Sequence, residues 1–307
     1  MKDKPLVSIV IPTYQRPQFL SRAINSCLNQ TYDNVEVIVV DDNNPDTEAR
    51  NETEELMSTF SKVSNLQYIR HEKNKNGSAA RNTGWRASSG KYITFLDDDD
   101  EISPAKIEKQ LECMESLSAD YGACYTAYII RMPNGTEQHS VTCDHGDVSM
   151  KALMRTLYLG SGSNLLLRKS VVDEVNGYDE SFRRNQDIEF MARVTEIYKF
   201  AYVPDVLLTI YLQPSNNRWS FSFIDGVTLF YLDKFKNRIA SLSEHDRQRV
   251  ISVITLDRAR VALYFKEYGQ ARRMLKVYNV PFKYIVKYIG FILKRYITKQ
   301  SYGFYIE

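Results

Sequence analysis

A short apolar strand that runs directly into four acidic residues constrains the fold more than any other stretch of the sequence. Residues 91–101 read KYITFLDDDDE, and the stretch Tyr92–Leu96 is apolar apart from Thr94, which is typical of a short buried strand. The adjacent carboxylates of Asp97–Asp100 repel one another, and removal from water makes this repulsion more costly. The run therefore predicts either a cation at the end of a buried strand or a solvated acidic turn that caps the next helix.

Carboxylate oxygens are hard ligands, which favour Mg²⁺ or Mn²⁺, and phosphate oxygens of a substrate would complete such a site. In open α/β sheets, ligands bind beyond the carboxyl ends of the strands. The four carboxylates lie at such an end. Other features of the sequence are needed to distinguish a cation site from a solvated acidic turn.

Apolar, β-branched runs alternate with segments of helical periodicity over the first 120 residues. Strands are expected at Leu6–Ile11, Val35–Val40, Leu66–Arg70 and Tyr92–Leu96. Helices are expected at Gln18–Asn29, 46–61, Ala79–Ser88 and Ser103–Leu117. This alternation predicts an α/β fold with a mainly parallel sheet flanked by helices. The second strand ends in Asp41 and Asp42, so these carboxylates and Asp97–Asp100 are expected at one edge of the sheet.

The second half of the chain changes from mixed to helical signals. Further strands are expected at Gly122–Met132, Gln138–Thr142, Ser163–Leu167, Phe200–Val203 and Val206–Leu212, with helices at Val148–Leu157, Ser170–Val175 and Gln186–Tyr198. Beyond these, only helices are expected, at Phe221–Ala240, Glu244–Tyr268, Gln270–Tyr278 and Phe282–Ile297. The pattern predicts one domain over residues 1–220 and a basic, amphipathic helical extension over 221–307.

Several motifs in fixed order resemble glycosyltransferase family two. They are VSIVIPTYQRPQFLSRAINSCLNQTYDNVEVIVVDD, GSAARNTGWRASSGKYITFLDDDD, NGYDESF and NQDIEF, and they span about residues 5–212. The resemblance implies a GT-A fold, which is Rossmann-like with a mixed, mainly parallel sheet. It also implies transfer of a sugar from a nucleotide donor with inversion of configuration.

The resemblance assigns nucleotide-binding roles to residues at the ends of three predicted elements. Pro12, Thr13, Tyr14 and Asp42 match positions that hold the base, and a carboxylate and an aromatic ring suit the edge and face of uracil. Packing at a strand end is the alternative for Tyr14, and turn capping is the alternative for Asp42. Arg81, in GSAARN, is placed to meet a diphosphate or the Asp run, and a surface ion pair with a Glu is its alternative.

The resemblance also assigns the acidic residues. Asp97, Asp98 and Asp99 cover the family's DXD motif: Asp99 is implied as a direct ligand of Mn²⁺ or Mg²⁺, and Asp97 or Asp98 as a contact to the ribose or a metal-bound water, with Asp97 also a candidate ligand. Because the run is all Asp, its register stays open.

The catalytic carboxylate of the family corresponds to Asp187 in NQDIEF. An inverting transfer needs one general base for the proton of the acceptor hydroxyl. Gln186 stands where the family commonly has the Glu of a Glu-Asp pair. Glu189 is a second candidate base, and capping of the helix N-terminus is the structural alternative for Asp187.

These assignments predict a metal-dependent enzyme that moves a hexose or N-acetylhexosamine from a UDP-sugar to a hydroxyl of a glycan acceptor, carried on a lipid, in cell-surface polysaccharide synthesis. The alternative is a non-catalytic scaffold protein that binds nucleotide sugars at the membrane. Nucleotidyl transfer is disfavoured because PTYQRPQ, after the first strand, does not supply a phosphate loop rich in Gly and Lys. The four histidines, His71, His139, His145 and His245, share no spacing and are expected on the surface.

The net charge of +2 is unevenly distributed. Residues 1–220 contain 24 Lys and Arg against 31 Asp and Glu, and residues 221–307 contain 16 against 7. Residues 271–300 hold eight Lys and Arg, no acidic residue, and many aromatic and aliphatic residues. This pattern predicts a helix on an anionic membrane surface. Packing on the core or on another subunit of an oligomer is the alternative, and no nucleic-acid motif is present.

The N-terminus enters a strand pattern without a small-residue cleavage site, and no stretch reaches the ~18 uncharged apolar residues that span a bilayer. The sequence therefore predicts a cytoplasmic protein, peripheral on the inner face of the cell membrane.

Overall fold

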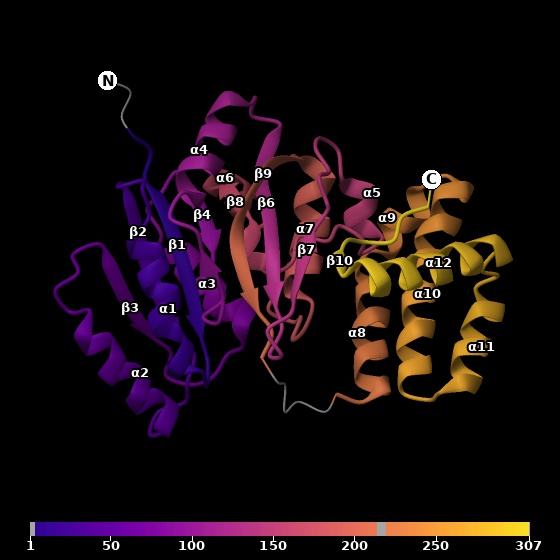
Figure 1. Cartoon of the computed structure of the whole chain (residues 1–307), viewed down its shortest axis with the longest axis horizontal. Coiled ribbons are helices and arrows are strands. Elements are labelled where there is room, and N and C mark those ends of the chain that lie inside the picture. The colour runs from indigo at the N-terminus through magenta and orange to yellow at the C-terminus, as the bar shows by residue number, and fades with distance from the viewer. Residues whose placement is uncertain (1–3, 214–218, 307) are drawn as a thin grey trace. The chain divides into compact units, whose positions relative to one another are not determined.

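The computed structural model describes residues 4–213 and 219–306, and these form two compact units (Figure 1). The sheet unit comprises residues 1–148 and 159–212, and the helical unit comprises residues 149–158 and 213–307. The segment 149–158, which contains α5 (Ser149–Leu153), thus belongs with the C-terminal helices. The sequence pattern gave no sign of this.

The parallel part of the sheet is formed by the first four strands. β1 (Val7–Thr13) lies between β2 (Val35–Asp41) and β4 (Tyr92–Phe95), and β3 (Leu66–Arg70) pairs with the other side of β2. Because all four run in the same direction, the ends of β1, β2 and β4 lie at one edge of the sheet. The register places Thr13 opposite Asp41 at that edge.

The other part of the sheet is largely antiparallel. β8 (Leu166–Arg168) pairs antiparallel with β4, followed by β6 (Tyr121–Arg131) and β7 (Glu137–Ser140). β9 (Lys199–Tyr211) runs parallel to β6 and also pairs with the short β5 (Glu101–Ile102). The mixed, mainly parallel α/β fold predicted from the sequence is confirmed.

Helices connect these strands and cover the sheet. They are α1 (Pro17–Leu28), α2 (Glu48–Thr59), α3 (Gly77–Ala87), α4 (Lys106–Ser116), α6 (Lys169–Glu174) and α7 (Gln186–Ile197). α1 shows why such segments are helical: Pro17 occupies the first turn, and Leu20, Ala23, Ile24 and Cys27 form a buried stripe at helical spacing.

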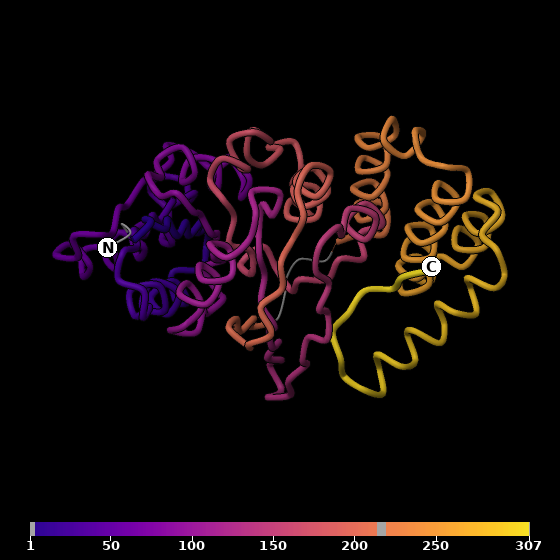
Figure 2. The backbone as a smooth tube through the Cα atoms, turned by 90° about the horizontal axis from the view of Figure 1, so that it is seen from above, coloured from indigo at the N-terminus to yellow at the C-terminus, as the bar shows by residue number. Residues whose placement is uncertain are grey.

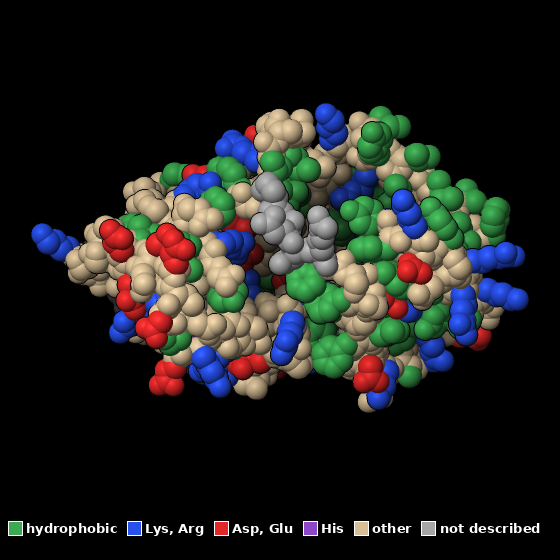
Figure 3. All heavy atoms as spheres, turned by 90° about the horizontal axis from the view of Figure 1, so that it is seen from below, with side chains coloured by type: hydrophobic (Ala, Val, Ile, Leu, Met, Phe, Trp, Pro, Cys, Tyr) green, Lys and Arg blue, Asp and Glu red, His purple; other side chains and the backbone are tan. Residues whose placement is uncertain are grey.

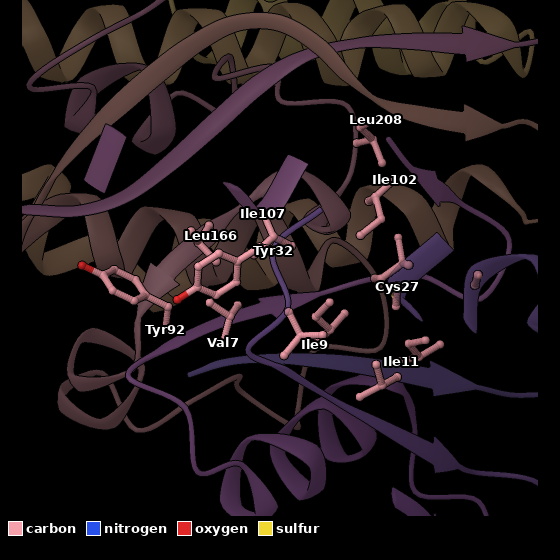
Figure 4. Packing of buried hydrophobic residues seen from close by; sticks show 14 of the residues in the cluster. Val7, Ile9, Ile11, Cys27, Tyr32, Tyr92, Ile102, Ile107, Leu166 and Leu208 are labelled. Atoms are coloured by element: carbon pink, nitrogen blue, oxygen red, sulfur yellow. The ribbon is translucent and has the colours of Figure 1, made fainter. Parts of the chain in front are cut away.

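The main hydrophobic core lies beside the central strand (Figure 4). Every residue of β1 is buried, which is typical of a parallel strand covered on both faces. Val7, Ile9 and Ile11 pack in one cluster with Cys27 of α1 and Tyr92 of β4. The core therefore fixes β1 against its neighbours up to the edge where the strands end.

Several boundaries differ from the predictions. The two strands expected at Phe200–Val203 and Val206–Leu212 are one strand, β9, whose pairing with β6 shifts register around Pro204 and Asp205. Proline lacks the N–H that a regular ladder needs, so it falls at this irregularity. The strand expected at 163–167 is a 3₁₀ turn, Gly162–Asn164, followed by β8, and the helix expected at 148–157 is only α5.

Asp42 anchors the loop between β3 and α3. Its Oδ1 accepts from the backbone N–H of Lys75 (2.8 Å), and its Oδ2 accepts from the backbone N–H of Asn76 (3.0 Å) and the side-chain amide of Asn74 (2.8 Å). His71 Nδ1 lies 2.7 Å from Oδ1. Asn76 in turn caps α3, because its side-chain oxygen accepts from the backbone N–H groups of Ser78 and Ala79. One carboxylate thus orders the whole entry into α3.

The prediction that all four histidines are exposed is wrong for His71. Its ring is buried, with Nδ1 toward Asp42 and Nε2 2.9 Å from Thr83 Oγ1. His139, His145 and His245 are exposed as expected. The burial of His71 depends on partners 29 and 12 residues away, which spacing within the sequence does not indicate.

The helical unit contains α8 (Phe221–Lys234), α9 (Lys236–Ser241), α10 (Glu244–Tyr264), α11 (Tyr268–Val277), α12 (Phe282–Thr298) and the short β10 (Gln300–Ser301). The helix expected at 221–240 is broken into α8 and α9 at Phe235. α10 packs against α8 and α11, and α12 crosses this layer (Figures 1 and 2). Tyr231 of α8 donates to the carbonyl oxygens of Ala152 and Leu153, which ties segment 149–158 to the helices.

Among the described residues, no helix combines the length and the apolar character needed to cross a membrane.

The close approach of α3 to β1 generates a test at Gly84. A Cβ at this position would lie 2.2 Å from Cγ1 of Val10, inside the core. Gly84→Ala should therefore destabilise the protein by about 1–3 kcal/mol through overpacking. Gly226→Ala is the matched control, because no atom lies within 4 Å of the added methyl group and Ala favours the helix by up to ~1 kcal/mol. Urea unfolding followed by circular dichroism measures both, and an unchanged midpoint for Gly84→Ala would contradict the packing.

The anchor at Asp42 generates a second test. In Asp42→Asn, an amide NH₂ group replaces one acceptor oxygen, so two donors of the loop lose their partner. A buried donor without an acceptor costs about 1–3 kcal/mol. We expect faster hydrogen exchange at the backbone amide of Lys75 or of Asn76, whichever loses its acceptor oxygen, measured by NMR or mass spectrometry. Asp46→Asn, an exposed position in the neighbouring turn, should leave these amides as protected as before.

Candidate functional site

Each of the four consecutive carboxylates after β4 has at least one partner, and Asp98 and Asp99 share Arg16. Asp97 pairs with Arg81, and Asp99 pairs with Arg16. Asp98 accepts from Thr13 Oγ1 at 2.8 Å and lies 2.6 Å from Arg16. Asp100 accepts from the hydroxyls of Ser161 (2.9 Å) and Ser163 (2.7 Å). Mutual repulsion is thus relieved by separation and by partners from distant parts of the chain.

Burial divides the four into two pairs. Asp98 and Asp100 are buried, whereas the side chains of Asp97 and Asp99 remain 26% and 16% exposed. Burial raises the pKa of Asp98 to about 7, although Arg16 opposes the shift. Burial also raises the pKa of Asp100, and the nearby Asp97 adds to this effect. Asp98 and Asp100 therefore hold the turn together, and only Asp97 and Asp99 reach solvent.

Asp97 faces a polar pocket of about 180 Å³ in the sheet unit. The pocket is lined by residues of three regions: Arg81 of α3, Asp97 and Gly162 beside the strand ends, and Arg183, Arg184, Asn185, Gln186 and Asp187 at the start of α7. Asp97 and Asp187, assigned separately from the sequence, thus meet with Arg81 in one pocket.

Asp187 lies in the first turn of α7, after the N-cap residue Asn185. The alternative that Asp187 is itself the N-cap is therefore wrong. Burial raises its pKa above the ordinary value for Asp; Arg81 opposes this shift, and Asp97 adds to it. A carboxylate with a raised pKa at the wall of a polar pocket is a candidate general base.

Gln186, at the start of α7, accepts a hydrogen bond from Arg81. Its Oε1 accepts from Arg81 Nη1 at 2.8 Å, while the other nitrogen of that guanidinium pairs with Asp97. Arg81 is largely buried, so the surface ion pair considered for it is not what the structure contains. The guanidinium bridges the end of β4 and the start of α7 across the pocket.

Glu189, the second candidate base, is unsuited to that role in this structure. Its side chain is fully buried, and both oxygens accept from Arg193, at 2.6 and 2.8 Å. Arg193 also donates to the carbonyl oxygens of Val175 and Gly177. Glu189 therefore stabilises the packing of α7, and it does not line the pocket.

The residues expected around a nucleotide base lie together at the ends of β1 and β2, but their side chains differ in how exposed they are to a ligand. Thr13 O accepts from the backbone N–H of Asp42 at 2.9 Å, which joins the two strand ends. Pro12 and Thr13 are buried, and the hydroxyl of Thr13 is engaged by Asp98. Tyr14 is 39% exposed. Asp42 is buried with four donors around it, so capping of the local loop is its role in this structure.

The carboxylate oxygens at the end of β4 fit a divalent cation whose coordination would be completed by phosphate oxygens of a bound substrate. Among residues 4–213 and 219–306, no three His, Cys, Asp or Glu side chains form a ready-made metal site. Mg²⁺ commonly binds through one or two carboxylates together with substrate phosphates. Asp97 and Asp99 offer hard, partly exposed oxygens, and the arginines now paired with them would share these oxygens with the ion.

Sequence reasoning missed several residues that hold the site. Arg16 pairs with two of the four carboxylates, and Arg22 donates to Asp99 O while stacking on Tyr211 at 3.7 Å. A charge argument would have found such residues, because four adjacent carboxylates require cations nearby. Ser163 also accepts from the backbone N–H of Asp97 at 3.0 Å, and Gly162 lines the pocket. Residues 160–164 (GSGSN) therefore fix the acidic turn as well as contributing to the pocket wall.

Comparisons with known proteins find similar glycosyltransferases. A sequence profile of glycosyl transferase family 2 matches residues 8–175, more than half of the chain. An uncharacterized glycosyltransferase of Rickettsia bellii is 32% identical over 203 residues, which cover 63% of this chain and 28% of the relative. One from Methanocaldococcus jannaschii is 30% identical over 67% of this chain and 70% of its own length. The putative teichuronic acid biosynthesis glycosyltransferase TuaG of Bacillus subtilis is 31% identical over 43% of this chain and 50% of its own.

The chain thus spans only about a third of the length of rickettsial relatives such as those of R. bellii (28%) and Rickettsia felis (35%). Solved structures resemble it at low identity. Staphylococcus aureus TarS, residues 1–349 with UDP-GlcNAc, superposes with a TM-score of 0.58 at 15% identity over 98% of this chain and 94% of that one. The mannosyltransferase PcManGT of Pyrobaculum calidifontis, with GDP-Man and Mn²⁺, gives 0.60 at 14% identity over 97% and 84%.

These structural likenesses confirm the GT-A fold expected from the sequence. Together with the profile match over residues 8–175, they establish that the chain belongs to glycosyl transferase family 2.

Proposed function

We propose that the protein is an inverting, metal-dependent glycosyltransferase. It moves a hexose or N-acetylhexosamine from a UDP-sugar to a hydroxyl of a lipid-linked glycan acceptor in cell-surface polysaccharide synthesis. The observation that carries the proposal is the meeting of Asp187, Asp97 and Arg81 in one polar pocket at the end of β4. The TarS structures with UDP and UDP-GlcNAc, and the teichuronic acid role in the name of TuaG, support the donor and pathway class.

In this proposal the donor lies across the ends of β1, β2 and β4. Tyr14 presents its exposed ring to the base, with Pro12, Thr13 and Asp42 forming the floor beneath it. Asp97, Asp98 and Asp99 form the DXD motif: Asp99 and Asp97 hold Mn²⁺ or Mg²⁺, and buried Asp98 fixes the turn. A divalent cation bound there supplies positive charge to the diphosphate as it leaves. Arg81 adds a fixed positive charge beside the same position.

The chemical step needs one proton acceptor. Asp187 takes the proton of the acceptor hydroxyl while that oxygen attacks the anomeric carbon and the bond to the diphosphate breaks, which inverts the configuration. Burial and the nearby Asp97 raise the pKa of Asp187, so its affinity for the proton is greater than that of an exposed Asp. The second carboxylate of α7 is not needed, in keeping with the pairing of Glu189 to Arg193.

The metal assignment has a direct test. EDTA should abolish turnover, and Mn²⁺ or Mg²⁺ should restore it. Asp99→Asn should weaken Mn²⁺-dependent binding of UDP by at least about 10-fold, since even the loss of an outer-shell partner of a metal costs 10–100-fold. Isothermal titration calorimetry with UDP, with and without Mn²⁺, measures this. Asp205→Asn, which changes an exposed ion pair with Lys109, is the matched control. Unchanged UDP affinity in Asp99→Asn would overturn the assignment.

The general base has a separate test. Asp187→Asn should keep UDP-sugar binding and lose transfer by ~10²–10⁴-fold, since only the proton acceptor is removed. In the unmodified enzyme, transfer should fall as the pH is lowered through the raised pKa of Asp187, because the base acts only when ionised. Glu196→Gln, an exposed acid on the same helix, is the control and should behave as wild type. Transfer by Asp187→Asn at the wild-type rate would mean that another group is the base.

Release of UDP from a panel of UDP-sugars, with GDP-mannose as the comparison donor, tests the function as a whole. Turnover of a UDP-sugar supports the enzyme. Tight binding of nucleotide sugars without release of a nucleoside diphosphate, with or without acceptor, would favour the non-catalytic scaffold instead.

A further inference from the structure

The helix α12 exposes a long apolar stripe. Phe282, Val286, Ile289, Leu293 and Tyr296 follow one another at intervals of four and three residues, which places them on one side of a helix. They are 78%, 52%, 55%, 57% and 85% exposed, respectively. Neighbouring Ile297 is 76% exposed. Large apolar side chains arranged in this way mark a surface that meets another apolar phase or partner.

A different side of α12 packs within the helical unit. Tyr284 and Tyr288 are buried, and the Tyr288 ring contacts that of Phe304 with centroids 4.8 Å apart. The hydroxyl of Tyr288 also donates to Asp257 of α10 at 3.4 Å. The aromatic residues that the sequence predicted to face a membrane therefore lie on two sides of α12. One side packs within the helical unit, and the other is exposed.

Lysines border the exposed stripe. Lys283, Lys287 and Lys294 each follow a stripe residue by one position, which is about 100° around the helix, and all three are exposed. Residues 271–300 contain eight Lys and Arg and no acidic residue. On the face drawn in Figure 3, apolar side chains and Lys or Arg side chains lie interspersed over the helical unit. A cationic row beside an apolar stripe complements an anionic lipid surface.

We propose that the exposed stripe of α12 docks on an anionic membrane surface, with Phe282, Ile289 and Tyr296 at the level of the headgroups and upper acyl chains and the lysines on the phosphates. At 1.5 Å per residue, the 17 residues of α12 give a contact about 26 Å long. Docking of this kind would hold the proposed enzyme where lipid-linked acceptors lie. That last step rests on the proposed function, whereas the docking itself does not.

Charge favours a membrane over a second copy of the chain. Two copies joined through this stripe would bring two rows of lysines together, and the segment 271–300 has no acidic residue to pair with them. Residues 221–307 as a whole carry 16 basic and 7 acidic residues, so longer-range repulsion acts in the same direction. An anionic bilayer satisfies both the apolar stripe and the cations.

Co-sedimentation of the full chain with lipid vesicles tests the proposal. The protein should bind vesicles of equal parts phosphatidylcholine and phosphatidylglycerol, and binding should weaken when NaCl shortens the Debye length from ~10 Å at 0.1 M to ~3 Å at 1 M. The variant K283Q/K287Q/K294Q should bind about 100-fold more weakly, at roughly fivefold for each cation near an anionic surface. The variant I289Q/L293Q/Y296Q, which replaces only exposed side chains, should also bind more weakly.

Matched controls change the same chemistry elsewhere. K62Q/K91Q/K199Q removes three exposed charges from the sheet unit, and L263Q/Y264Q removes exposed apolar side chains from α10; both should sediment as wild type. Failure of the wild type to bind the anionic vesicles, or equal binding by the α12 variants, would overturn the proposal. So would a wild-type dimer, seen by analytical ultracentrifugation, that I289Q/L293Q/Y296Q dissociates. UDP release, assayed separately, should be unchanged in every variant, so failure of docking is distinguishable from failure of the proposed function.

Discussion

Four adjacent carboxylates at the end of a buried strand are the constraint on which the rest of the sheet unit depends. An unpaired charge in a protein interior costs several kcal/mol, and like charges side by side add to that cost. The fold meets the constraint by giving every carboxylate at least one donor. Arg81 pairs with Asp97, Arg16 is shared by Asp98 and Asp99, Thr13 donates to Asp98, and the hydroxyls of Ser161 and Ser163 donate to Asp100. Asp98 and Asp100 are buried and hold the turn together, whereas Asp97 and Asp99 remain partly exposed to solvent.

The partners of the acidic turn come from both strand directions of the mixed sheet. The partners of Asp98 come from the end of β1, which runs parallel to β4, whereas the partners of Asp100 come from the turn before β8, which runs antiparallel to it. The parallel neighbour, β1, ends beside the acidic turn, and the antiparallel neighbour, β8, begins beside it. Residues from both directions thus contact the turn, and Asp97 remains open to the pocket that Asp187 also lines.

Much of this arrangement could be predicted from local sequence, and the rest depended on distant contacts. Strands such as β1 and β2 were predictable because a buried parallel strand is a continuous apolar run. The shared edge of Asp42 and Asp97–Asp100 followed from the alternation of strands and helices. The burial of His71 and the ion pair of Glu189 could not be predicted from local sequence, since each depends on how a partner side chain, Asp42 or Arg193, is oriented in the fold. Arg16 lies more than 80 residues from the carboxylates it pairs with.

The two units differ in where their charges find partners. In the sheet unit the acidic turn is matched inside the fold, by Arg16 and Arg81. In the helical unit the cations of residues 271–300 have no acidic residue within their own segment. The period of α12 shows two apolar sides, but period alone does not say which side packs, since both satisfy the same spacing. The aromatic contacts of Tyr288 decide this, and they leave the lysine-bordered side exposed, which is the side that we propose docks on a membrane.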